Sequence, residues 1–247
     1  MQAVGSAAPV FAGAGGTVRV ALRPGVRAGG PVRLAGALLC AAVLWAWAPR
    51  PLAWDVTRLA QAAARMGPAA VAAAQALRTA LGEAARMDEA ARARAVNDFF
   101  NQRVAYVDDQ QAWGAHDHWA SPLELLARAQ GDCEDYAIAK YFSLVAAGTA
   151  AAKLRLVYVR VDQGSGVPPM PHMVLAYYPA PGAEPLILDN LVEQIRTASQ
   201  RPDLQPVFSF NADGLWQGTQ GDRAGDPSAR LSRWRDVLAK AAAEGFR

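Results

Sequence analysis

The chain has 247 residues, 52% of them hydrophobic and 19% charged, and a formal net charge of +3. This composition excludes a disordered or fibrous protein and leaves room for one large globular domain. Residues 1–53 hold five of the 25 basic side chains and none of the 22 acidic ones, so residues 54–247, with 20 basic and 22 acidic side chains, are slightly acidic. A nucleic-acid-binding domain needs a basic surface, so we expect no nucleic acid partner.

The first 53 residues have the pattern of an export leader. An uncharged apolar run over 34–48 follows Arg33 and ends at Pro49. A spanning helix needs about 20 apolar residues, whereas a run of this length with a basic flank and small residues behind it is typical of a secretory signal peptide. We therefore predict a leader over 1–53 and an exported domain over 54–247. An uncleaved N-terminal anchor is the alternative.

Three packing helices are predicted at the start of the exported domain. The segments 56–66, 68–81 and 88–104 are rich in Ala, Arg and Leu at helical spacing and are separated by glycine and proline. A loop over 106–120 follows, and it contains His116 and His118. The two histidines could ligate a transition metal, but a pair without a third ligand favours a solvated loop.

A capping box marks the next helix. Ser121-Pro122-Leu123-Glu124 has a capping serine, a proline at the first helical position and a glutamate three residues after the serine. This pattern predicts a short helix over 121–130 that leads the chain to Gly131.

Cys133 is the candidate nucleophile. It follows Gly131-Asp132 and opens an apolar-periodic run that should be a helix to about residue 147, with Gly148 as its stop. Free N–H groups and the helix dipole in a first turn favour the thiolate. The other cysteine, Cys40, lies in the leader, so the exported domain keeps one unpaired thiol, for which catalysis is a reason. A buried cysteine that only packs is the alternative.

His172 and Asp189 complete a possible triad of nucleophile, base and orienter. Strands are expected over 154–161, 172–178 and 186–191. If the chain reverses midway between residues 180 and 181, His172 lies directly opposite Asp189 on one face of an antiparallel hairpin, whereas a one-residue slip would separate them. A buried histidine that a carboxylate satisfies for structure alone is the alternative.

Asp132, Glu134 and Asp135 place three carboxylates around the same thiol. Their negative charge alone would raise the pKa of Cys133 and suppress the thiolate, and a bound cation would reverse that effect. Oxygen ligands of this kind suit Ca²⁺ better than zinc. The alternative is that Asp132 is a helix cap and the other two are first-turn acids that the dipole favours.

The segment Gly131-Asp132-Cys133-Glu134-Asp135-Tyr136-Ala137 resembles the active-site motif of the bacterial transglutaminase-like cysteine proteinases. The segments 117–122, 172–175 and 188–190 extend the resemblance, which covers about residues 96–216. It implies an α+β, papain/transglutaminase-like fold with N-terminal helices and a nucleophile helix packed on an antiparallel sheet. It also implies Cys133 as nucleophile, His172 as base and Asp189 as orienter.

The same resemblance implies a biological role. A member of this family would be a periplasmic, Ca²⁺-dependent endopeptidase, with Ca²⁺ held mainly by Asp132 and Glu134. It would cleave a large surface adhesin near its N-terminus, beside paired alanines, and so promote biofilm dispersal. An inner-membrane cyclic-di-GMP receptor would inhibit it. The long leader departs from the short signal usual in the family.

Two other functions remain open on the sequence. A transglutaminase-type acyl transferase would use the same triad but deliver the acyl group to an amine instead of water. A calcium-dependent binding module would keep the fold with an idle triad.

Overall fold

A computed structural model describes residues 54–219 and 223–246, so the predicted signal peptide and the boundary at residue 53 lie outside the described residues. The helices are α2 (Val56–Met66), α3 (Pro68–Ala84), α4 (Glu89–Arg103), α5 (Asp109–Trp113), α6 (Pro122–Arg128), α7 (Cys133–Ala146), α8 (Pro227–Arg230) and α9 (Ser232–Ala243), with 3-10 turns η2 (Ala151–Lys153) and η3 (Ala198–Gln200). The strands are β1 (Ala105–Tyr106), β2 (Gln130–Gly131), β3 (Leu154–Val161), β4 (Met170–Tyr177), β5 (Leu186–Leu188), β6 (Arg196–Thr197), β7 (Leu204–Phe210), β8 (Leu215–Gln217) and β9 (Arg223–Gly225). None of the helices in this described part has the length and apolarity that a bilayer crossing requires.

The predicted helices are confirmed, and their caps explain where they begin. Asp88 accepts a hydrogen bond from the Ala91 N–H at the start of α4, and Ser121 and Glu124 form the expected capping box at the start of α6. Such caps satisfy the free N–H groups of a first turn. Helix α3 continues to Ala84 instead of ending at residue 81, because Gly82 adopts an ordinary helical backbone.

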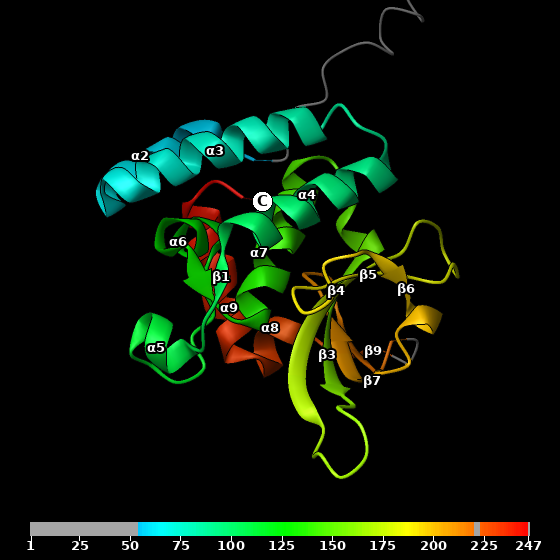
Figure 1. Cartoon of the computed structure of the whole chain (residues 1–247). Coiled ribbons are helices and arrows are strands. Elements are labelled where there is room, and N and C mark those ends of the chain that lie inside the picture. The colour runs from blue at the N-terminus through cyan, green and yellow to red at the C-terminus, as the bar shows by residue number, and fades with distance from the viewer. Residues whose placement is uncertain (1–53, 220–222, 247) are drawn as a thin grey trace, which may run out of the picture. The chain divides into compact units, whose positions relative to one another are not determined.

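An antiparallel sheet of seven strands, in the order β6-β5-β4-β3-β7-β8-β9, forms the second half of the domain (Figure 1). Its side chains alternate between two apolar clusters. Leu156, Leu175 and Phe210 belong to the main core with the helices, whereas Val157 and Val174 belong to a smaller cluster on the other face. The predicted α+β class is therefore confirmed.

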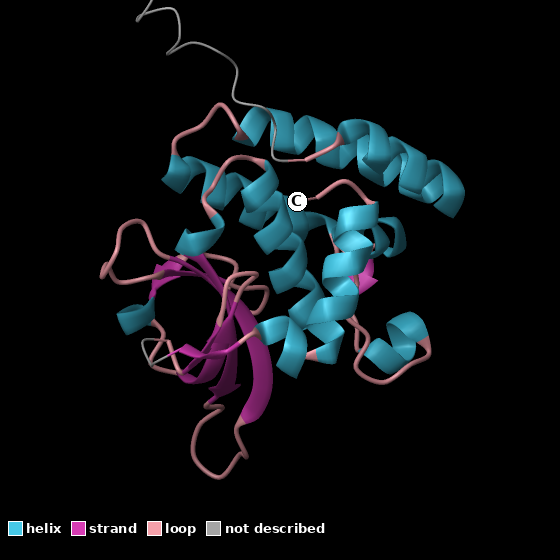
Figure 2. Cartoon of the chain, turned by 180° about the vertical axis from the view of Figure 1, so that it is seen from behind, coloured by secondary structure: helices cyan, strands magenta, loops and turns pink. Residues whose placement is uncertain are grey.

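Helix α7 lies between the other helices and the sheet (Figure 1, Figure 2). Eleven of its 14 residues are buried, including the charged Asp135 and Lys140. The burial extends around most of the helix, because other helices and the sheet pack against α7 on several sides. A helix this enclosed holds its first residue in a fixed position.

The predicted register of the β4–β5 hairpin is wrong by two residues. The observed pairs include Leu175 with Leu188 and Tyr177 with Leu186, which place the reversal between residues 181 and 182. The Ala183 N–H donates to the Ala180 carbonyl, so Pro181-Gly182 takes the two central turn positions, with Gly182 at a φ of 74°. Proline followed by glycine favours this type II turn over one centred a residue earlier.

Candidate active site

Cys133 is the first residue of α7, as the sequence predicts. The preceding residue pair, β2, is held by parallel pairing with β1, so the chain enters the helix at a fixed angle. Gly131 is required there, because a Cβ at this position would lie 2.5 Å from Asp135 Oδ2 and 2.6 Å from Leu125 Cδ1. The side chain of Asp132, at the N-cap, makes no capping hydrogen bond. It therefore leaves the N–H groups of the first turn unblocked.

The surroundings of Cys133 favour the thiol over the thiolate. Burial raises the pKa of Cys133 most, and the charges of Glu134 and Asp132 raise it further. The Cys133 Sγ lies 3.0 Å from Glu134 Oε2 and donates its proton to it. A hydrogen bond from the Met173 N–H acts in the opposite direction. Burial and the two carboxylates thus both favour the protonated thiol, and the effect of the carboxylates is the one that the sequence argument for a cation anticipates.

His172 and Asp189 form a buried pair. The His172 Nε2 and Asp189 Oδ1 atoms are 2.7 Å apart, and each residue is 2% exposed. The two are not directly opposite, because the observed register extends to place Asp189 across from Val174. A shift of two residues keeps both side chains on the same face, since side chains alternate with a period of two. The predicted contact is therefore present although the predicted register is wrong.

One pocket contains both Cys133 and His172, with a volume of about 490 Å³. Because Nε2 of His172 faces Asp189, Nδ1 is the ring nitrogen left to exchange a proton with a thiol or a substrate. Aromatic and aliphatic side chains make up much of the remaining lining: Tyr106, Trp119, Tyr158, Met173, Phe208 and Leu231. The pocket can therefore receive an extended apolar segment of peptide beside the thiol.

The Asp189 carboxylate is fully satisfied by hydrogen bonds. Its Oδ1 also accepts from the N–H groups of Asn190 and Leu191, and its Oδ2 accepts from Arg201 Nη1 at 2.8 Å. Burial, the largest single influence, would raise the pKa of Asp189, but His172, Arg201 and Leu191 together hold it at about 2. Asp189 therefore stays ionised beside the imidazole.

The backbone of Asp189 is anchored separately. Its carbonyl oxygen accepts from Asn101 Nδ2 at 2.8 Å and from Lys140 Nζ at 3.1 Å. Further along the same loop, the Glu193 carbonyl accepts from Asn97 Nδ2 at 2.8 Å. Burial lowers the pKa of Lys140 to about 7. Helices α4 and α7 thus fix the loop that carries Asp189.

A second set of acids lies beside the nucleophile. Ligand atoms of Asp132, Cys133 and Glu134 lie within 4.8 Å of one another, and so do those of Asp109, Asp132 and Asp135. The sequence predicted Asp132, Glu134 and Asp135 at a metal site but missed Asp109. Asp109 is a first-turn acid of α5, and only the tertiary fold brings it to the cluster.

Burial first and neighbouring acids second raise the pKa values of these carboxyls. The pKa rises to about 10 for Asp132, about 7 for Asp135 and about 6 for Asp109. Within the described residues, Asp109 Oδ1 and Asp132 Oδ1 are buried without a hydrogen-bond partner. Buried carboxylates with free oxygens fit a hard cation such as Ca²⁺.

Both carboxylate oxygens of Asp135 accept hydrogen bonds from the protein, unlike the free oxygens of Asp109 and Asp132. Its Oδ1 accepts from the Ala120 N–H at 2.7 Å and its Oδ2 from Trp113 Nε1 at 3.3 Å. The histidines of the loop are used differently. The His118 ring stacks on Trp113 with centroids 4.4 Å apart, and among the residues described neither His116 nor His118 joins a group of metal-ligating side chains.

A buried His–Asp pair, and a cysteine that begins a helix packed on an antiparallel sheet, are the parts of a papain-like cysteine protease. The sequence model of the family described as bacterial transglutaminase-like cysteine proteinase BTLCP matches residues 71–203. The chain belongs to this family of cysteine proteinases.

Solved structures of LapG from Legionella pneumophila are similar to this chain at 36% sequence identity. One has a TM-score of 0.64 and covers 76% of this chain and 97% of that one. An EGTA-treated form gives a TM-score of 0.66 with the same coverage, and a calcium-bound form gives 0.65, covering 75% of this chain and 98% of that one. A comparison with curated sequences gave no match.

Proposed function

We propose that the protein is a periplasmic, calcium-dependent cysteine endopeptidase. In this proposal it cleaves a large cell-surface adhesin near its N-terminus, beside paired alanines, releases the adhesin and so promotes biofilm dispersal. An inner-membrane cyclic-di-GMP receptor controls it. One observation carries the enzymatic part: the thiol at the start of α7 shares a pocket with His172, whose Nε2 lies 2.7 Å from Asp189. Family membership and the predicted leader support the biological part.

The triad chemistry follows from this arrangement. Cys133 Sγ attacks the scissile carbonyl carbon, and His172 Nδ1 takes the thiol proton while Asp189 holds the opposite ring nitrogen. The uncapped first-turn N–H groups of α7 can stabilise the oxyanion. His172 then gives its proton to the leaving amine, which departs and leaves a thioester on Cys133. Water, deprotonated by His172, hydrolyses the thioester and restores the thiol.

The metal part of the proposal rests on the buried acids and on the calcium-bound and EGTA-treated relatives. Asp132 and Glu134 would hold Ca²⁺, with Asp109 as a further ligand and Asp135 beside them. Bound Ca²⁺ would neutralise the carboxylates that raise the pKa of the thiol. Asp109 also accepts a hydrogen bond from the His118 N–H, and Asp135 accepts from Ala120. Ca²⁺ bound to these carboxylates would therefore also fix the loop that contains His118 and Ala120, beside the pocket.

The proposed activity can be tested with peptides that contain paired alanines and with the N-terminal fragment of a candidate adhesin. The wild type should cleave them in Ca²⁺, EGTA should stop cleavage, and added Ca²⁺ but not Mg²⁺ should restore it. Cys133→Ala should be inactive, and Asp189→Asn should lose about 10²- to 10⁴-fold in kcat. Turnover by Cys133→Ala at the wild-type rate would refute a cysteine protease.

The same assay separates the alternatives. Mass spectrometry with an added primary amine would reveal acyl transfer as an amide product instead of a free acid. An idle triad would leave Cys133 labelled by iodoacetamide no faster than a free thiol, even with Ca²⁺. Adding the periplasmic domain of a candidate receptor should lower the cleavage rate if that receptor is the inhibitor.

A further inference from the structure

Arg201 contacts the triad from the side that faces away from His172. Its Nη1 donates to Asp189 Oδ2 at 2.8 Å, while Asp189 Oδ1 faces His172 at 2.7 Å. Arg201 is 4% exposed, and it leads from η3 into β7, on a part of the chain that carries none of the triad residues. The two oxygens of one buried carboxylate are thus divided between an imidazole and a guanidinium.

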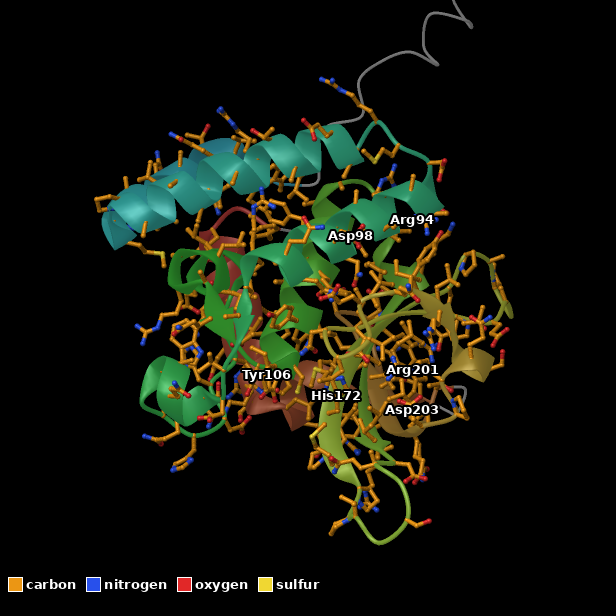
Figure 3. All side chains as sticks on the ribbon, viewed as in Figure 1. Arg94, Asp98, Tyr106, His172, Arg201 and Asp203 are labelled. Carbon is orange, nitrogen blue, oxygen red and sulfur yellow. The ribbon has the colours of Figure 1, made fainter. Side chains whose placement is uncertain are left out.

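Arg201 is itself held in place. Its Nη2 lies 2.8 Å from Asp203 Oδ2, and its Nε lies 3.0 Å from Asp203 Oδ1. Figure 3 shows Arg201 and Asp203 next to each other, beside His172. A two-point contact between guanidinium and carboxylate fixes the plane of the guanidinium. The Arg201 N–H also donates to the Ala198 carbonyl, which anchors the backbone.

We propose that Arg201 is a positioning residue of the triad, which holds the Asp189 carboxylate in the rotation that presents Oδ1 to His172, and that Asp203 fixes Arg201 for this role. This inference rests on the proposed function. Without Arg201, Oδ2 would be a buried acceptor without a partner, and the carboxylate could turn to share its oxygens differently between His172 and the backbone.

Other groups near Asp189 cannot replace this contact. Lys140 and Asn101 bind the backbone carbonyl of Asp189 and leave its carboxylate rotation free. Asn190 and Leu191 donate to the same oxygen that faces His172. In the described part of the chain, Arg201 is the group that binds Oδ2, so the orientation of the carboxylate depends on it.

The substitution Arg201→Ala should lower kcat by about 10²-fold, because a misplaced imidazole impairs proton transfer, and should change KM by less than about 2-fold. Guanidinium at low millimolar concentration should restore part of the activity, since it fits the space left by the side chain. In an Asp189→Asn background, Arg201→Ala should lower kcat by less than about 3-fold, because the carboxylate that Arg201 orients is already absent. Arg155→Ala is the control, since Arg155 is a half-buried arginine of β3 that stacks on Trp216 at 4.0 Å, away from the triad.

A second readout does not depend on proteolysis. In proton NMR spectra the Nε2 proton that His172 shares with Asp189 should give a low-field resonance, identified by its loss in His172→Ala. Arg201→Ala should shift or broaden this resonance, and Arg155→Ala should not. Should Arg201→Ala fail to fold, Asp203→Asn provides the same test, because it loosens Arg201 without removing a large side chain.

The outcomes separate this inference from the proposed function. An unchanged resonance in the folded variant, a kcat loss equal to that of Arg155→Ala, or losses that multiply with Asp189→Asn would each overturn the role of Arg201. If the wild type cleaves nothing, the proposed function fails, and the resonance alone decides whether Arg201 positions the pair. Rescue by guanidinium together with a shifted resonance would support the role.

Discussion

If Ca²⁺ binds the acids around Cys133 as proposed, replacing Asp109 by Asn should remove most of the stabilisation that the ion gives to the folded protein. Asp109 Oδ2 accepts a hydrogen bond from the His118 N–H, and Oδ1 is buried without a partner among the described residues. An asparagine keeps one oxygen for His118 and presents an NH₂ group in place of the free oxygen. The loop contact is thus kept while one of the proposed cation ligands is lost.

The size of the effect follows from linkage. At a Ca²⁺ concentration of 100 times Kd, binding to the folded state alone stabilises it by about 2.7 kcal/mol. For a domain of this size each kcal/mol moves Tm by roughly 2–4 °C, so wild-type Tm should rise by roughly 5–11 °C. If the substitution weakens affinity about 100-fold, the same Ca²⁺ concentration equals Kd and stabilises by only about 0.4 kcal/mol, or roughly 1–2 °C.

The assay is thermal unfolding across a Ca²⁺ titration, with EGTA as the zero point. Asp108→Asn is the matched control: it removes the same charge one residue away, and asparagine can replace Asp108 as the cap that accepts from the Gln111 N–H. The control should keep the wild-type rise in Tm. A full rise and an unchanged half-saturation point in Asp109→Asn would show that Asp109 is not a ligand, and the same result in Asp132→Asn would place Ca²⁺ elsewhere.

Three further predictions concern the same region and its supports. The folded-state pKa values of the cluster acids are raised, so these acids stabilise the fold while protonated and Tm in EGTA should fall as pH increases from about 4 through 7. The increase in Tm that Ca²⁺ gives should become larger over that pH range, and an increase that does not depend on pH would contradict this. In urea unfolding, Gly131→Ala should destabilise the folded protein by about 1–3 kcal/mol, because the added Cβ clashes with Asp135. Gly82→Ala, at an open helical position, should stabilise it by about 0.5–1 kcal/mol, and equal effects of the two substitutions would refute the packing argument. Glu244→Ala should cost about 2–5 kcal/mol in the same assay, because Ser121 Oγ and the Leu123 N–H lose their buried acceptor, and a cost below about 1 kcal/mol would show that water replaces it.

The parts of the fold that could be predicted from the sequence are those with local causes. The capping box at Ser121 and the acid at Asp88 mark helix starts because a side chain satisfies N–H groups within three residues of itself. Cys133 could be placed at the start of its helix for a similar local reason. The α+β class was expected from the family resemblance around Cys133, and the helical spacing of the first half and the alternation of the strands agree with it.

The hairpin register shows how a correct contact can follow from a wrong detail. The turn was predicted one residue too early. In a hairpin, moving the turn by one residue changes the partner of each residue by two positions, so His172 was paired with the wrong residue. The side-chain period of two then returned Asp189 to the same face. Turn chemistry at Pro181-Gly182 carried the missing information, since glycine with positive φ belongs in the second central position.

Asp109 and Arg201 could not be found from sequence pattern, because neither breaks a local rule. An acid in the first turn of α5 and an arginine near an aspartate two residues away are ordinary features of a soluble chain. The acids around Cys133 differ, because three carboxylates beside a thiol oppose the chemistry that the helix start favours. Such a conflict between local rules is by itself a sign of a functional site. Asp109 and Arg201 come from segments distant from these acids, so only the fold reveals that Asp109 brings an oxygen without a partner among the described residues to the cluster and that Arg201 binds Asp189.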